Sequence, residues 1–175
     1  MGYLREMARR KPTIFVSSTG YDLQQIGADI RQFIEGIGCE AVLCGYDSTS
    51  MEPSAATADN CREAVESRAD ILFLVVGGRC GSMADAGGSI TNHEYLAARA
   101  KRIPTYVFVL KSALSILPVW QANPSGDFSQ AVDSPKLLEF VASMKGKVWV
   151  FPFESAQDII NVAREQMEVL FSHVK

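Results

Sequence analysis

Five short apolar segments, separated by amphipathic ones, constrain the fold of this chain more than any other feature. The clearest is 70–76 (DILFLVV), which is apolar after its first residue. A strand of this kind is covered on both faces, as strands of parallel sheets are. The other apolar segments are 13–17, 39–44, 104–110 and 147–152. Strands that alternate with helices predict a parallel sheet with helices on both faces.

Helices are expected between these strands, where apolar residues recur at steps of three and four. The expected helices cover 23–37, 58–65, 91–102, 134–144 and 155–171. The stretch 111–133 contains two prolines and one glycine and is expected to be irregular. Its length suggests a lid or a partner surface.

The expected fold is a flavodoxin-like three-layer α/β sandwich with a five-stranded parallel sheet in the order 2-1-3-4-5. One domain at 12–175 is expected, preceded by a flexible leader at 1–11. No internal repeat or domain boundary interrupts this pattern. In such a sheet, the ligand crevice opens where strands one and three diverge, at their carboxyl ends.

Composition excludes several function classes. The 175 residues carry a net charge of −3, which argues against a nucleic-acid binder. No apolar run reaches the roughly 18–20 residues of a membrane span. With two histidines and four cysteines, none in a C-x-x-C pair, no metal site is expected. Reduced, mostly buried thiols in a cytoplasmic protein are the expected state of Cys39, Cys44, Cys61 and Cys80.

Two loops rich in small residues are predicted to meet at the crevice. The first provides Ser17, Ser18, Thr19, Tyr21 and Asp22, and the second provides Gly78, Arg79 and Ser82. Free N–H groups at the start of the first helix favour a phosphate group there, and Arg79 adds a cation. A tight turn with a helix cap explains the same Ser-Thr-Gly residues without a ligand.

Glu94 is the carboxylate of most interest at this edge. One interpretation is structural, because Thr91 to Glu94 has the T-x-x-E pattern of a capping box. The other is chemical, because one carboxylate can stabilise the oxocarbenium-like state formed when a nicotinamide–ribose bond breaks. The helix N-terminus is expected to keep Glu94 ionised for that role.

Four motifs follow one another along the chain: TIFVSSTGYDL, ADILFLVVGGRCGS, SITNHEYLAA and IPTYVFV, at 13–23, 69–82, 89–98 and 103–109. In their order and spacing the chain resembles a TIR-related (STIR-type) family of unknown function, often found at the N-termini of NACHT and other STAND-type NTPases. The wider group includes TIR domains and nucleoside 2-deoxyribosyltransferases. This chain departs from the family pattern at Cys80, where the family has tyrosine.

The resemblance implies that Glu94 acts at the ribose C1′ of NAD or a related nucleoside, with NAD as substrate and no cofactor. It also implies self-association and a role in prokaryotic antiviral defence, with a STAND or NACHT partner. A non-catalytic signalling module and a deoxyribosyltransferase-like enzyme are the alternatives. An FMN-binding flavodoxin is a weaker one, because Asp22 would repel the cofactor phosphate.

Overall fold

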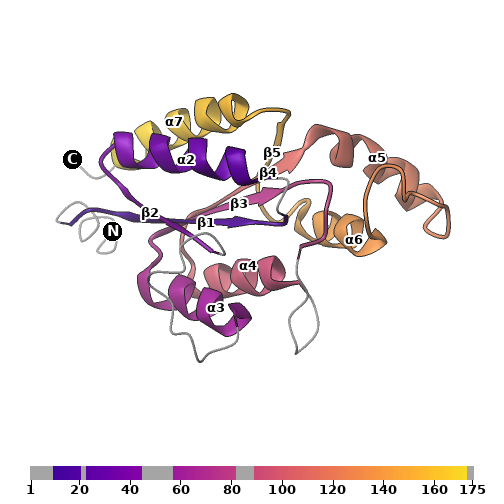
Figure 1. Cartoon of the computed structure of the whole chain (residues 1–175), viewed down its shortest axis with the longest axis horizontal. Helices are drawn as coiled ribbons and strands as arrows, with labels where there is room; N and C mark the ends of the chain where they lie inside the picture. The colour runs from indigo at the N-terminus through magenta and orange to yellow at the C-terminus, as the bar shows by residue number, and fades with distance from the viewer. Residues whose placement is uncertain (1–9, 21–22, 45–56, 82–88, 173–175) are drawn as a thin grey trace.

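A five-stranded parallel sheet in the order β2-β1-β3-β4-β5 forms the middle layer of the protein (Figure 1). The computed structural model describes residues 10–20, 23–44, 57–81 and 89–172. The strands are β1 (Thr13–Ser18), β2 (Glu40–Leu43), β3 (Ile71–Val76), β4 (Thr105–Leu110) and β5 (Val150–Phe153). The predicted fold class and strand order are therefore confirmed.

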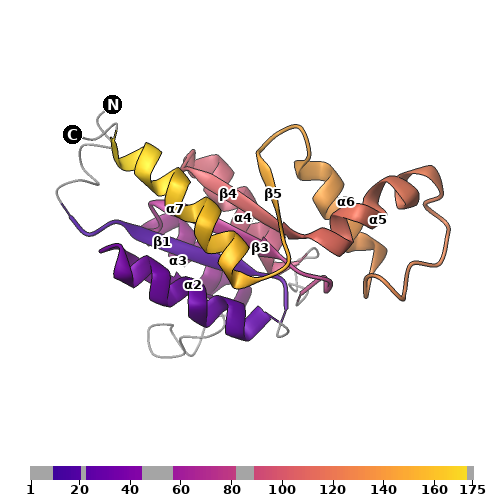
Figure 2. The same ribbon diagram turned by 90° about the horizontal axis from the view of Figure 1, so that it is seen from above.

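Helices cover both faces of the sheet. Helices α2 (Gln24–Gly36) and α7 (Ala156–Ser172) lie side by side on one face, as Figures 1 and 2 show from two directions. Helices α3 (Thr57–Arg68) and α4 (Ile90–Lys101) lie together on the other face. Helices α5 (Lys111–Ala122) and α6 (Pro135–Met144) pack into the same core as α3 and α4. No helix within the described ranges is long and apolar enough to cross a membrane.

Alternation along the strands divides the core into two halves. Phe15, Leu72 and Leu74 pack toward α3 and α4. Their neighbours along the strands, such as Ile14 and Phe73, pack toward α2 and α7. This is the two-residue period of strand side chains, seen here with both faces buried. The continuous apolar run of β3 is thus explained by its central position, because all six of its residues are buried.

The stretch 111–133 differs from its expected irregular structure. Its first half is helix α5, which follows β4 directly and contains Pro118 in its interior. A proline there lacks one helical N–H donor and crowds the preceding turn, so the sequence pattern disfavoured a helix. Buried Ala113 and Leu117 anchor α5 to the core, and this tertiary packing offsets the cost of the proline.

The two predicted loops meet at the carboxyl ends of β1 and β3. The Thr19 N–H donates to the Val75 carbonyl at 3.1 Å, and the Gly77 N–H donates to Thr19 Oγ1 at 2.9 Å. Gly81 adopts a φ of +76°, and a Cβ built there would lie 2.6 Å from the Thr19 carbonyl oxygen. The second loop therefore lies directly against the backbone of the first.

We expect Gly81→Ala to destabilise the protein more than Gly146→Ala does. Both glycines have positive φ, so each substitution carries a conformational cost of about 1–2 kcal/mol. Only Gly81 has backbone within contact distance, since nothing lies within 4 Å of a Cβ at Gly146. Chemical denaturation of the two variants measures the difference. Equal losses of stability would mean that the two loops are not in close contact.

Candidate functional site

Buried polar side chains gather where β1 ends and α4 begins. Most of the described protein interior is apolar, so a group of such residues requires an explanation. The side chains in question belong to Ser17, Thr19, Ser89, Thr91 and Glu94, each at most 7% exposed. They lie at the carboxyl edge of the sheet, at the switch point between β1 and β3, where α/β proteins bind ligands.

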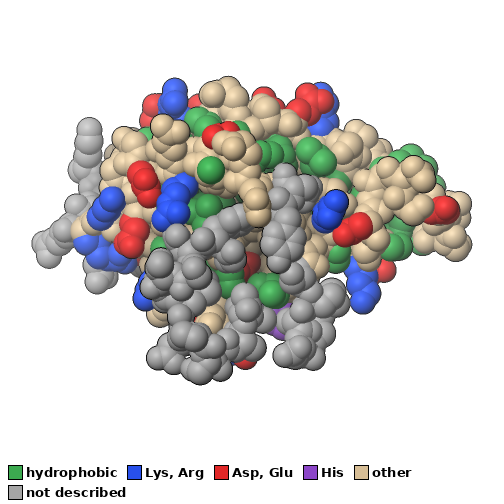
Figure 3. All heavy atoms as spheres, viewed as in Figure 1, with side chains coloured by type: hydrophobic (Ala, Val, Ile, Leu, Met, Phe, Trp, Pro, Cys, Tyr) green, Lys and Arg blue, Asp and Glu red, His purple; other side chains and the backbone are tan. Residues whose placement is uncertain are grey.

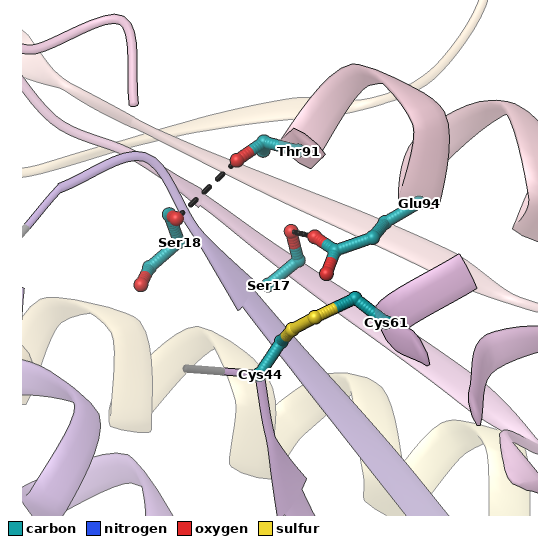
Figure 4. Close-up of a disulfide and its surroundings, with 6 residues drawn as sticks. All are labelled: Ser17, Ser18, Cys44, Cys61, Thr91 and Glu94. Carbon is teal, nitrogen blue, oxygen red and sulfur yellow. Dashed lines mark hydrogen bonds between the residues drawn. A yellow bond between two sulfur atoms is a disulfide. The ribbon is translucent and has the colours of Figure 1, made fainter. Parts of the chain in front are cut away.

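Glu94 is the only ionisable member of this group, and it lies in the interior with 1% of its surface exposed. The Ser17 hydroxyl donates a hydrogen bond to Glu94 Oε2, as Figure 4 shows. Glu94 Oε1 has no hydrogen-bond partner in the part of the chain that the structure describes. A buried carboxylate oxygen without a partner is costly, and such atoms are frequently found at functional sites.

Glu94 does not cap its helix, which overturns the capping-box interpretation. The N-cap is Ser89, whose side chain accepts a hydrogen bond from the Asn92 N–H at 3.2 Å. Helix α4 thus begins one residue before the T-x-x-E pattern, and Glu94 is its fifth residue. Thr91 instead donates from its hydroxyl to the Ser18 carbonyl at 3.3 Å, which ties α4 to the end of β1.

Burial raises the pKa of Glu94 to about 8, and the hydrogen bond from Ser17 lowers it by a smaller amount. Removal from water penalises the charged carboxylate more than one donor can stabilise it. The expectation that the helix N-terminus keeps Glu94 ionised is therefore wrong for neutral pH. The macrodipole acts mainly on the first turn, and Glu94 lies beyond it.

The other predicted site residues differ in how deeply they are buried and in whether the structure describes them. Thr19 is 1% exposed, and its hydroxyl is used to hold Gly77, so it links the two loops. Ser18 and Gly78 are half-buried, and the Arg79 side chain is exposed on the second loop. Tyr21, Asp22 and Ser82 lie outside the described residues.

Two cysteines complete the surroundings of Glu94, and their position there was not predicted from the sequence. Cys44, which follows β2, and Cys61, on α3, form a disulfide with a Cα–Cα distance of 5.8 Å (Figure 4). The prediction of reduced thiols is therefore wrong for Cys44 and Cys61 in this structure. Cys39 and Cys80 are free thiols, as expected. A separation of 17 residues resembles no motif, and the tertiary packing of the end of β2 and of α3 brings the pair together.

The two sulfur atoms and one Glu94 carboxylate oxygen lie within 4.8 Å of one another. Within the described residues, this is a group of ligand atoms that could hold a metal ion. The three residues come from three separate elements: the end of β2, α3 and α4. Figure 4 shows the disulfide beside the Ser17–Glu94 pair.

A second buried carboxylate, at the opposite edge of the sheet, shows what a fully satisfied group looks like here. Asp70, 1% exposed, accepts from the Thr13 N–H at 2.9 Å and forms an ion pair with Arg10. Nearby, Lys101 Nζ donates to the Ala69 carbonyl at 2.7 Å. These contacts join the first strand to β3 and have a structural role. Glu94 is different in kind, because one of its oxygens has no partner among the described residues.

Comparison with known proteins places this architecture among TIR-like α/β domains. The structure is similar to the TIR domains of the activated Roq1 resistosome, which directly recognises the pathogen effector XopQ. The TM-score is 0.50 at 13% sequence identity, over 90% of this chain and 99% of that one. At this identity the likeness concerns the fold.

The family follows from the sequence match. Residues 13–168 match the model of a domain of unknown function, DUF4062, and the chain belongs to that family. No curated protein matches the chain. The predicted resemblance is therefore confirmed for the family of unknown function and for the TIR-like fold.

We expect Glu94→Gln to flatten the pH dependence of stability. Between the ordinary pKa of 4.5 and about 8, folded wild type holds a proton on Glu94 that the unfolded chain has lost. Its free energy of unfolding therefore falls as pH rises through this window, at up to about 1.4 kcal/mol per pH unit. Glutamine does not titrate, so the variant lacks this component.

Urea denaturation at intervals from pH 5 to pH 8 measures the effect. The control is Glu165→Gln, which changes an exposed glutamate on α7 and should keep the wild-type slope. If Glu94→Gln and wild type lose stability in parallel, Glu94 does not carry the raised pKa.

Proposed function

We propose that this domain binds a nucleotide and cleaves the nicotinamide–ribose bond of NAD, with Glu94 as the catalytic carboxylate. The observation that carries the proposal is the buried carboxylate itself. It lies at the switch point of the sheet, oriented by Ser17, and its second oxygen has no partner among the described residues. A group of that kind, costly to the fold, is a candidate for chemistry.

In the proposed reaction, the C1′–N bond breaks and nicotinamide leaves as a neutral molecule with the bonding electron pair. Positive charge develops on the ribose ring, and the Glu94 carboxylate stabilises it electrostatically. Water then bonds to C1′ and releases a proton, which gives ADP-ribose. Ser17 positions the carboxylate, so it is a positioning residue in this scheme.

The remaining predicted residues belong to the nucleotide-binding part of the proposal. The turn at Ser18 and Thr19 and the second loop at Gly78 and Arg79 converge through the Thr19–Gly77 hydrogen bond. The backbone of small residues lets a phosphate approach closely, and the exposed Arg79 guanidinium supplies positive charge. Tyr21, Asp22 and Ser82 stay predictions for the same role.

A non-catalytic TIR-like signalling module is the second candidate, and a specific observation favours it. Glu94 is almost fully buried, and a pKa of about 8 leaves only about one tenth of it ionised at pH 7. A substrate would have to displace covering groups and restore the charge. A deoxyribosyltransferase-like enzyme would use the same carboxylate on a deoxynucleoside, so the substrate distinguishes it from the first candidate.

Substitution of Glu94 by glutamine should reduce NAD cleavage by roughly 10²–10³-fold, equivalent to about 3–4 kcal/mol of transition-state stabilisation. Glutamine preserves the shape of the side chain but supplies no negative charge. Turnover of NAD and of deoxynucleosides is followed by HPLC, with melting temperature measured on the same preparations.

Wild-type activity should also rise with pH toward about 8, since the ionised carboxylate is the active form. Glu165→Gln, remote on α7, should cleave NAD as wild type does. A folded Glu94→Gln protein that turns over NAD at the wild-type rate would remove Glu94 from the mechanism. If no preparation cleaves either substrate, the signalling module is the better proposal.

Self-association is part of the same proposal, together with action in the cytoplasm in antiviral defence beside a STAND or NACHT partner. The similar TIR domains come from an activated resistosome. Here Trp149 and Leu96 expose 82% and 55% of their surface, so both apolar side chains are accessible to a second copy. On the face in Figure 3, acidic and basic side chains of the described residues are interspersed.

We expect the specific activity to increase with protein concentration, because association would complete or stabilise the site. Turnover per molecule is measured across a dilution series, beside the mass from size-exclusion chromatography with light scattering. A strict monomer with constant specific activity would contradict this part of the proposal.

A further inference from the structure

The group formed by Cys44, Cys61 and Glu94 has the chemistry of a metal site. One ligand atom from each residue lies within 4.8 Å of the other two. Zinc bonds to cysteine sulfur at about 2.3 Å and to carboxylate oxygen at about 2.0–2.2 Å, so its ligands are usually separated by less than about 4.6 Å. The three atoms thus lie close to the separations that ligands of one zinc ion have.

The state of the Glu94 carboxylate oxygens is a second and independent observation. Among the described residues, Oε1 is buried without a hydrogen-bond partner, and the carboxylate faces the two sulfurs (Figure 4). A buried polar atom normally has a partner, and a bound cation is one of the ways to supply it. The Ser17 hydroxyl holds Oε2, as neighbours of metal ligands often do.

The fold holds these ligands in place whether or not they are bonded to each other. Cys61 is fully buried on α3, Glu94 is 1% exposed on α4, and α3 packs against α4. Cys44 follows β2, whose register with β1 runs from Thr13–Glu40 to Val16–Leu43. The site is therefore built from three elements whose positions are set by the core, as binding sites on rigid elements are.

We propose that, when the Cys44–Cys61 disulfide is reduced, the two cysteine sulfurs and the Glu94 carboxylate bind one Zn²⁺ ion. Two sulfur ligands and one oxygen select a borderline-soft, tetrahedral ion over Mg²⁺ or Ca²⁺, which prefer oxygen alone. Three protein ligands leave the fourth position for water. A reducing compartment keeps such a cysteine pair as thiols, available for metal.

The chemistry balances with a trialkylphosphine as the reductant. The phosphine takes oxygen from water and becomes the phosphine oxide, while the two sulfurs gain two electrons and two protons and become thiols. Zinc bonds to deprotonated ligands, so each thiol releases its proton to solvent as its sulfur binds the metal. A protonated Glu94 carboxyl group releases its proton in the same way.

The proposal does not depend on NAD cleavage, and its test uses no nucleotide. The chain is reduced with the phosphine, desalted without oxygen and titrated with Co²⁺, whose visible absorption reports tetrahedral thiolate ligation. We expect one Co²⁺ per reduced chain, displaced by Zn²⁺, and no such absorption from the oxidised chain. Cys44→Ser should lose the thiolate bands, and Glu94→Gln should weaken binding by more than about 10-fold.

The matched control is Cys80→Ser, which changes a half-buried free thiol outside the group and should bind as wild type does. Circular dichroism of each metal-free variant reports folding. A reduced wild-type chain that binds no cobalt, or a Cys44→Ser chain that keeps the thiolate bands, would overturn the proposal.

A measurement on the wild-type chain alone keeps the test decisive if the variants do not fold. Reduced protein is alkylated with iodoacetamide with and without Zn²⁺, and the modified cysteines are identified by peptide mass mapping. Zinc should protect Cys44 at least 10-fold and leave Cys80 reactive. Equal alkylation of Cys44 in both samples would show that no zinc binds there.

Discussion

Parallel pairing of β1 with β3 determines where every polar group of interest in this protein lies. The register places Ser17 beside Leu74 and Ser18 beside Val75, in the centre of the sheet. Because both faces of these strands are buried, polar side chains can appear only where the strands end. Ser17 is the last fully buried residue of β1, and its hydroxyl meets Glu94 of α4 at that point.

The two buried carboxylates of the described chain show how differently a fold can treat the same chemical group. Asp70 is compensated by an arginine and a backbone donor, and it helps to hold the amino edge of the sheet. Glu94 receives one hydroxyl donor, and the cost of its burial appears as a raised pKa. A structural role alone would favour full compensation, because an unsatisfied buried oxygen reduces stability.

Glu94 supports two proposals that exclude each other at any one moment. A carboxylate bonded to zinc cannot also stabilise positive charge on a ribose ring. Metal in the reduced site would therefore accompany a state different from the one that acts on a nucleotide. Under the zinc proposal, the cysteine pair would connect the redox state of the protein with the availability of the buried Glu94 carboxylate.

The sequence alone was enough for the sheet, its strand order and the position of Glu94 near the switch point. The strands and helices follow from local patterns, because apolar runs and helical stripes depend on burial that the sequence shows directly. The strand order follows from the winding that is common for five alternating strands and helices. The prediction failed for α5, where packing of Ala113 and Leu117 overrides Pro118. It also failed for the start of α4, since Ser89 and Thr91 are equally good caps by composition.

Only the tertiary structure decided the state and surroundings of the key groups. Whether Glu94 is charged depends on how much water surrounds it, and burial by residues from several elements raises its pKa against the helix dipole. The meeting of Cys44 with Cys61 depends on a strand end and a helix that are separated by 17 residues. Such properties arise from distances between segments remote in sequence, and residue spacing does not encode those distances.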